Sequence, residues 1–272
     1  MIRIILILFL SFPVALCAQT YQQLSEKAIE YIEMDSLSKA EELLLQALKL
    51  EPKNAHNALL FSNLGLVQRK LGRYNDAVES YTYALNIAPL AVPILLDRAA
   101  INLEMGNTDR AYTDYCQVLD EDKQNKEALL MRAYIYVLRR DYPAARIDYN
   151  RLLEIDPQSY SGRLGLATLE QKEGKFKEAL EILNKMITAT PEDATLYIAR
   201  ADVEREMKHE DLALVDLEEA IRLNPSSADA YLLRGNIYLT QKKKALAKMD
   251  FEKAISLGIP PADLHEQLKQ CK

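Results

Sequence analysis

The sequence predicts an all-α protein that consists of seven antiparallel helix pairs and a short final helix. Three observations predict this fold: a 34-residue period, apolar side chains at helical spacing within each period, and Gly or Pro where helices should end. Alanines mark the period. Six of these marker alanines follow one another at intervals of 34 residues: Ala77, Ala111, Ala145, Ala179, Ala213 and Ala247. Ala40 precedes Ala77 by 37 residues, so the first junction is three residues longer.

Each period has the pattern of two helices packed on each other. Twelve residues before each marker alanine is a small residue, which allows two helices to approach closely: Ala28, Gly65, Ala99, Ala133, Ala167, Ala201 and Gly235. Four residues after it is a large apolar one that fills the adjoining space: Leu44, Tyr81, Tyr115, Tyr149, Leu183, Leu217 and Phe251. The predicted repeats are 21–54, 58–91, 92–125, 126–159, 160–193, 194–227 and 228–261.

The ends of the predicted helices follow from Gly and Pro. Gly72, Gly106 and Gly174 lie between the two helices of a repeat, where a helix C-terminus favours a left-handed residue. Proline closes the second helix of five repeats because it cannot continue a helix: Pro52, Pro89, Pro157, Pro191 and Pro225. Residues 262–272 are expected to form a capping helix in which Leu264 and Leu268 cover the last repeat.

Residues 1–18 have the pattern of a secretory signal peptide. Arg3 precedes an apolar run over 4–16, which is too short to span a bilayer, and small residues follow. Cleavage after Ala18 would leave Gln19 first. Two alternatives remain: a lipidated Cys17, or an uncleaved anchor. We therefore expect an exported protein in the periplasm, with an outer-membrane lipoprotein as the alternative, and membrane contact only if Cys17 is lipidated or the segment is retained.

Composition excludes several classes of function. The chain is 49% hydrophobic and 27% charged, with a formal net charge of −6, as in an ordered soluble protein. An acidic chain is poorly suited to bind nucleic acid, because binding requires positive charges that neutralise the phosphates. Three cysteines cannot form a disulfide scaffold.

No catalytic or metal-binding pattern stands out in the sequence. His56, His209 and His265 have no second ligand at metal spacing, and no phosphate-binding or nucleophile motif occurs. Residues 120–124 resemble a calcium loop, but Asn125 and Met131 replace its required Gly and Glu, which favours an ordinary turn. The basic run 242–244 is expected in a solvated turn. The sequence predicts neither an enzyme nor a cofactor.

Charged residues vary together within the repeats. Four repeats carry an arginine on the first helix and an aspartate on the second: Arg98 with Asp114, Arg132 with Asp148, Arg200 with Asp216, and Arg234 with Asp250. The fifth repeat has Leu166 and Ile182 at these positions instead. We therefore predict four structural ion pairs, each within one repeat, rather than a charged binding ladder.

The second repeat closely resembles the tetratricopeptide-repeat pattern through Leu64-Gly65, Gly72-Arg73-Tyr74, Ala77, Tyr81, Ala84 and Pro89, and all seven repeats share it. The resemblance implies a right-handed α-solenoid, with residues 19–272 as one superhelical domain. Lys123 and Arg163 depart from the pattern. The leader followed by Gln19 is similar to exported repeat proteins of Bacteroidetes-type bacteria.

The resemblance also implies that the first helices line a concave groove, which in this family binds peptides. The groove positions carried onto this chain are Leu66, Arg69, Leu96, Ala100, Leu103, Leu130, Tyr134, Val137, Leu164, Thr168, Ile198, Asp202 and Arg205. The family's clamp for a C-terminal carboxylate is absent because its lysine position holds Ser or an aliphatic residue. We expect a scaffold or adaptor that binds an apolar peptide or helix of another protein. The alternatives are a small-molecule or glycan binder using Tyr134, and leucines that merely pack against the next repeat.

Overall fold

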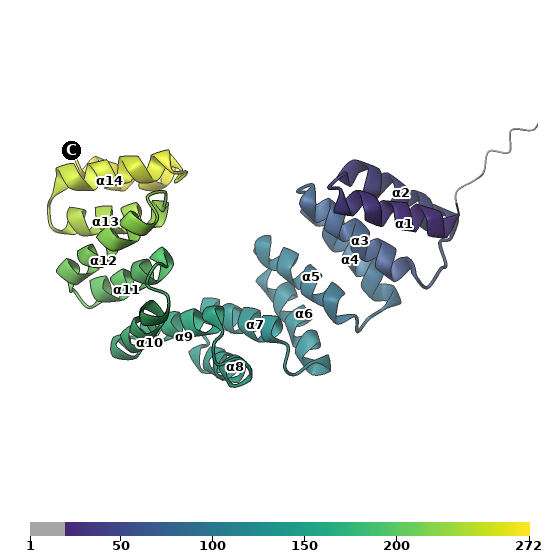
Figure 1. Cartoon of the computed structure of the whole chain (residues 1–272), viewed down its shortest axis with the longest axis horizontal. Coiled ribbons are helices and arrows are strands. Elements are labelled where there is room, and N and C mark those ends of the chain that lie inside the picture. The colour runs from purple at the N-terminus through teal and green to yellow at the C-terminus, as the bar shows by residue number, and fades with distance from the viewer. Residues whose placement is uncertain (1–19) are drawn as a thin grey trace, which may run out of the picture. The chain divides into compact units, whose positions relative to one another are not determined.

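The computed structural model describes residues 20–272, and the predicted signal peptide with Cys17 lies outside this range. The described chain is helical throughout and contains no strand, and its helices pack as consecutive pairs (Figure 1). The all-α prediction is therefore confirmed, including the helix at the C-terminal end. By their contacts the helices divide into two compact units, one that ends at Glu121 and one that runs from Asp122 to Lys272.

The first unit contains three helix pairs. Their bounds are α1 (Tyr21–Glu33) with α2 (Leu37–Leu50), α3 (Asn57–Lys70) with α4 (Tyr74–Ile87), and α5 (Val92–Glu104) with α6 (Thr108–Glu121). The second unit contains four pairs: α7 (Lys126–Leu138) with α8 (Tyr142–Ile155), α9 (Tyr160–Lys172) with α10 (Phe176–Ala189), α11 (Ala194–Glu206) with α12 (Glu210–Leu223), and α13 (Ala228–Thr240) with α14 (Lys244–Ser256). A 3₁₀ turn (Pro261–Leu264) and α15 (His265–Gln270) complete it.

Polar caps and left-handed residues define the helix ends. Thr20 and Gln23 form a capping box at the start of α1, and Asn125 caps α7 by accepting from the backbone N–H of Ala128. The turns within pairs place Gly72 at φ +75°, as predicted for a helix C-terminus. Four repeats adopt the same turn without glycine, at Asp35, Arg140, Lys208 and Lys242. A side chain in this conformation is strained, which is why glycine is favoured there.

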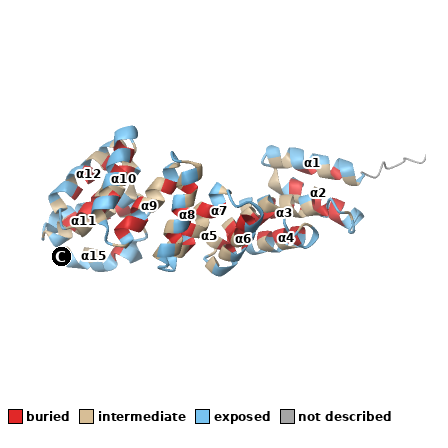
Figure 2. Ribbon diagram, turned by 90° about the horizontal axis from the view of Figure 1, so that it is seen from below, coloured by how far each residue is buried: buried red, intermediate tan, exposed pale blue. Residues whose placement is uncertain are grey.

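The core lies along the contact between the two helices of each pair. Every marker alanine is fully buried, and buried residues occupy the sides of helices that face their neighbours (Figure 2). Tyr81 fills the space above Gly65 so closely that a Cβ added to Gly65 would lie 2.9 Å from the tyrosine ring. Gly235 and Phe251 repeat this contact in the last pair. The small residue is therefore required for the aromatic ring to pack.

The C-terminal segment covers the last pair, as predicted. Leu264 is 2% exposed and belongs to one apolar cluster with Phe251 and Ala254, against which Leu268 also packs. These contacts remove from water the apolar surface that a further repeat would otherwise cover.

All four predicted arginine–aspartate pairs are present. In each, the arginine of the first helix donates two hydrogen bonds to the aspartate sixteen residues later, with distances of 2.6–3.0 Å. The aspartate side chains are only 3–8% exposed, so these are not surface pairs. Bidentate geometry and burial make them stronger than an exposed pair.

Candidate functional site

The first helices of neighbouring pairs lie side by side within each unit. In the first unit α3 contacts both α1 and α5, and in the second α7 contacts α9 and α11 contacts α13. Side chains at equivalent positions of these helices therefore share one surface in each unit, which we call the first-helix face. The predicted groove residues lie on helices of this face, in both units.

A cavity of about 350 Å³ opens on the first-helix face of the first unit. Ile29 of α1 and Leu59 of α3 border it and remain 40% and 56% exposed. Its other lining residues are Tyr21, Gln22, Ser25, Glu26, Asn54, His56 and Leu60. The apolar side chains here can be covered by a ligand without displacing anything in the core.

The polar groups around this cavity are already bonded to one another. The Tyr21 hydroxyl donates to Asn57 Oδ1 at 3.0 Å, and the Asn57 amide donates to the Glu51 carbonyl at 2.7 Å. Ser25 Oγ donates to the Tyr21 carbonyl at 2.7 Å. Burial, followed by the negative charge of Glu51, raises the pKa of Tyr21. The cavity therefore presents mainly its apolar wall to a ligand.

The groove residues predicted in the first unit lie on α3 and α5, and none of them lines this cavity. Leu66, Leu96 and Leu103 are half-buried. Arg69 forms an ion pair with Glu104, which joins α3 to α5. Arg69 is therefore a link between two first helices as well as a residue of their surface.

Sequence reasoning missed Ile29 and Leu59. A signal for Ile29 exists, because the 37-residue offset that relates Ala40 to Ala77 also relates Ile29 to Leu66. Leu59 lies two turns before Leu66 on the same helix, at a position that the groove prediction did not include. The equivalent residues of the later repeats, Pro93, Glu127, Ser161, Thr195 and Asp229, are exposed as well, and Leu59 is the large aliphatic residue among them.

In the second unit, Tyr134 is the aromatic residue among the predicted groove positions, and its ring is exposed. It is 45% exposed, and the neighbouring Leu138 of α7 is 51% exposed. The other apolar residues are partly buried: each packs on an apolar cluster of the pairs and leaves a smaller part of its side chain accessible. These residues are Leu130, Val137, Leu164 and Ile198.

The polar end of the predicted groove is bonded within itself. Asp202 accepts from Arg205 Nη2 at 2.6 Å and from Gln171 Nε2 at 2.8 Å. The Thr168 hydroxyl donates to the Leu164 carbonyl at 2.9 Å. These groups have few hydrogen bonds left to offer a polar ligand.

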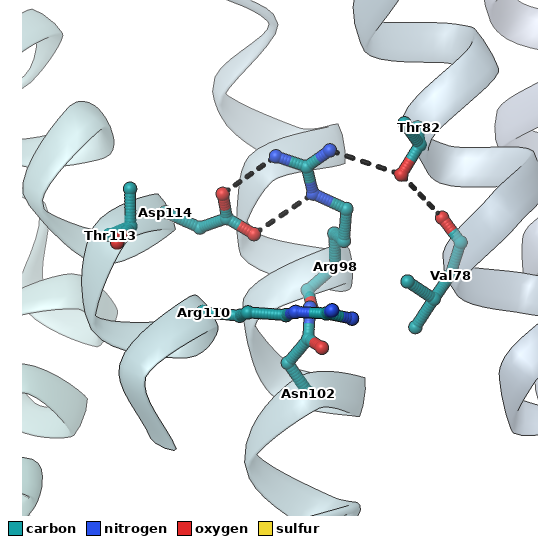
Figure 3. Close-up of a pocket in the computed structure, with 7 residues that line it drawn as sticks. All are labelled: Val78, Thr82, Arg98, Asn102, Arg110, Thr113 and Asp114. Carbon is teal, nitrogen blue, oxygen red and sulfur yellow. Dashed lines mark hydrogen bonds and ion pairs between the residues drawn. The ribbon is translucent and has the colours of Figure 1, made fainter. Parts of the chain in front are cut away.

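A second kind of cavity lies between consecutive second helices (Figure 3). It measures about 280 Å³ and is lined by Arg98, Asp114, Thr82, Val78, Asn102, Arg110 and Thr113. Arg98 donates to both oxygens of Asp114 and, through Nη1, to Thr82 Oγ1 of the preceding pair at 3.2 Å. Asp114 neutralises the charge of Arg98. Through these hydrogen bonds Arg98 links α4, α5 and α6, which is a structural role.

Residues 20–272 contain neither a candidate membrane span nor a candidate metal cluster. None of their helices has both the length and the apolar character of a membrane span. No three His, Cys, Asp or Glu side chains in this range come together as they would around a metal ion.

Family models described as tetratricopeptide repeat match most of the chain. The matched ranges are 26–92, 96–160, 139–203 and 228–257. Among curated proteins, the human and mouse DnaJ homolog subfamily C member 7 are each 31% identical to this chain over 94 residues. Those residues are 34% of this chain and 19% of each relative, so the match spans about a fifth of their length.

Solved structures share the fold. The crystal structure of a tetratricopeptide repeat protein from Parabacteroides merdae has a TM-score of 0.85 and 36% identity, covering 92% of this chain and 98% of that one. The pilF protein of Pseudomonas aeruginosa has a TM-score of 0.60 and 16% identity, over 77% and 94% of the two chains. The second likeness is one of fold alone.

Proposed function

Because the chain belongs to the tetratricopeptide-repeat family, we propose that it is a non-catalytic interaction protein whose first-helix face binds an apolar helix or peptide of another protein. Members of this family generally mediate protein–protein interactions. The proposal for this chain goes further, to the face and to the chemistry of the ligand. It covers both the residues predicted from sequence and the cavity beside Ile29 and Leu59.

The observation that carries the proposal is the exposed apolar wall of that cavity. Full burial of one large aliphatic side chain contributes about 1.5–3 kcal/mol, and the exposed parts of Ile29 and Leu59 together equal about one such side chain, so covering both offers about 1.5–3 kcal/mol. The polar atoms nearby are already hydrogen-bonded, so an apolar ligand would leave few of them unsatisfied. An amphipathic helix, which places apolar residues on one side, suits such a surface.

The test is capture of a partner from native cell envelope by cross-linking and co-purification. We expect the double variant Ile29→Glu and Leu59→Glu to lose the partner, because each substitution places a charge in the apolar wall. The matched control is Leu45→Glu, on the second helix α2, where the side chain is 50% exposed and does not line the cavity. Circular dichroism must first show that both variants fold.

The same experiment examines the second unit with Tyr134→Glu. The control is Ile147→Glu on the second helix α8, which is 67% exposed. A partner lost with Tyr134→Glu alone would place the ligand on α7 rather than at the cavity. A partner retained by every first-helix variant would refute the proposed face. A soluble glycan that raises the melting temperature, with no protein partner, would favour the alternative of a small-ligand protein.

We further propose that the protein is exported to the bacterial cell envelope. The charged start, the short apolar run and the small residues up to Ala18 support this, and Cys17 leaves a lipoprotein as the alternative. Mass spectrometry of the N-terminus from cells distinguishes the two. A chain that begins at Gln19 indicates a periplasmic protein, a lipid on Cys17 indicates a lipoprotein, and an intact Met1 in the cytoplasm would refute export.

A further inference from the structure

The second helices of the last two pairs expose four large apolar side chains. Leu212 and Val215 on α12 are 56% and 63% exposed, and Leu246 and Met249 on α14 are 44% and 65% exposed. We call these four residues the outer patch. They are carried by second helices, so they are separate from the first-helix face.

The fold does not require apolar residues at these positions. Each lies one residue before or two residues after a marker alanine, and the earlier repeats hold mostly polar residues there. The earlier residues at these positions are Lys39 and Glu42, Asp76 and Glu79, Arg110 and Thr113, Ala144 and Ile147, and Glu178 and Glu181. Only the last two repeats have large apolar side chains at both positions. The outer patch therefore calls for an explanation other than repeat packing.

The surfaces of the two pairs join at one edge of the patch. Helix α13 packs against both α12 and α14, and the three helices follow one another at the C-terminal end (Figure 1). A hollow of about 620 Å³ is lined both by the start of α12, including Asp211 and Leu212, and by Gln241 of the turn before α14. The last pair and α12 thus share a continuous outer surface.

Charges beside the outer patch differ in sign between its two helices. Glu210, Asp211 and Glu218 lie beside the apolar pair of α12, and within the described part of the chain none of them forms an ion pair. Lys244, Lys248 and Lys253 lie beside the apolar pair of α14. Of these lysines, Lys248 approaches Glu252 at 3.7 Å, and Lys253 lies over the ring of Tyr231. On α12 the charges beside the patch are mainly acidic, whereas on α14 the three lysines outnumber Glu252, which lies one turn after Met249.

We propose that the outer patch binds a second copy of this chain. A two-fold symmetric contact brings α12 of each copy against α14 of the other. The two-fold axis repeats every contact, so the α12–α14 contact occurs twice in the interface. Leu212 and Val215 then cover Leu246 and Met249, while the acidic margin meets the basic margin at both ends. The surface is complementary to itself in charge, which favours a second copy over an unrelated partner.

The first test is sedimentation velocity of the purified chain over about 1–100 µM, a range suited to transient complexes. We expect the sedimentation coefficient to rise with concentration for the wild type. The double variant Val215→Glu and Met249→Glu should remain monomeric throughout. The control is Ile147→Glu, which occupies the equivalent position on α8 at 67% exposure and should associate like the wild type. Circular dichroism confirms that all three proteins are folded.

The second test reverses the charges of one helix at a time. Asp211→Lys with Glu218→Lys makes both margins basic, and Lys244→Glu with Lys248→Glu makes both margins acidic. Each variant alone should be monomeric, whereas an equimolar mixture should associate because both contacts are again complementary. A wild type that stays monomeric over the whole range would overturn the proposal. So would a mixture that fails to associate, or loss of association with Ile147→Glu.

Discussion

Replacing Arg132 by Leu should destabilise the chain, because it leaves Asp148 buried without a counter-charge. Asp148 is 2% exposed and accepts hydrogen bonds from Arg132 Nε at 2.7 Å and Nη2 at 2.8 Å. Removing one partner of a buried pair costs about 3–5 kcal/mol. The Arg132 side chain is 20% exposed, so water reaches the site, and we expect the lower end, about 3 kcal/mol.

Asp148→Ile and the double variant Arg132→Leu with Asp148→Ile complete a double-mutant cycle. Asp148→Ile should cost less, about 1–2 kcal/mol, because the long Arg132 side chain can extend into water. The double variant reproduces the Leu166–Ile182 pair that the fifth repeat already uses. It should lie within about 1 kcal/mol of the wild type, since an apolar pair can replace a buried ion pair. The coupling between the two positions is then about 3–5 kcal/mol.

The assay is urea unfolding of the four proteins, followed by far-ultraviolet circular dichroism. Repeat arrays can unfold in steps, so hydrogen exchange of α7 and α8 provides a local measure of the same effect. If the two single effects add in the double variant to within about 0.5 kcal/mol, the positions are uncoupled and the structural role assigned to the pairs is wrong.

Three further predictions concern packing, backbone strain and pH. Gly165→Ala should destabilise by about 1–3 kcal/mol, because the new Cβ would lie 2.5 Å from the Tyr149 ring; an unchanged melting temperature would contradict this. Arg140→Gly should stabilise by about 0.5–1 kcal/mol, because Arg140 has φ +60°; a lower melting temperature would argue against strain. Burial raises the pKa of Tyr149 to about 12, and partial burial together with a hydrogen bond to Asp193 raises that of Tyr160 to about 12, from about 10 when unfolded. Protonated tyrosine is favoured in the fold, so this contribution to stability is complete below pH 10 and declines between about pH 10 and 12; a free energy of unfolding that stays constant from about pH 9 to 12 would refute it.

The helix pairs were predictable because seven copies of one pattern reinforce each other. The ion pairs were predictable for the same reason, since Leu166 and Ile182 change together where the charges are absent. How deeply the pairs are buried could not be read from the sequence. Spacing places Asp148 opposite Arg132, but only the packing of neighbouring helices decides that the carboxylate is shielded from water.

The candidate site was harder to predict than the fold. Repeat position identifies which side of a helix a residue occupies, yet Leu130 and Tyr134 show that one side can be partly core and partly open. Leu130 packs on the cluster around Tyr149, while nearly half of Tyr134 is accessible. Ile29 and Leu59 lie at repeat positions that are exposed in other repeats as well, but a large aliphatic side chain at these two positions is particular to the first two repeats. Whether any of these residues binds a ligand stays a prediction.

The third contact of some arginines has a consequence for how the chain unfolds. Arg98 reaches Thr82 of the preceding repeat, and Arg200 reaches Asn184 in the same way, at 2.7 Å. In a linear array, stability is the sum of each repeat and of its contacts with its neighbours. A guanidinium shared by two repeats adds to the neighbour contribution, so opening one repeat removes a hydrogen bond from the next. The second and third repeats, and likewise the fifth and sixth, should therefore exchange their protected amides as joint blocks rather than one repeat at a time.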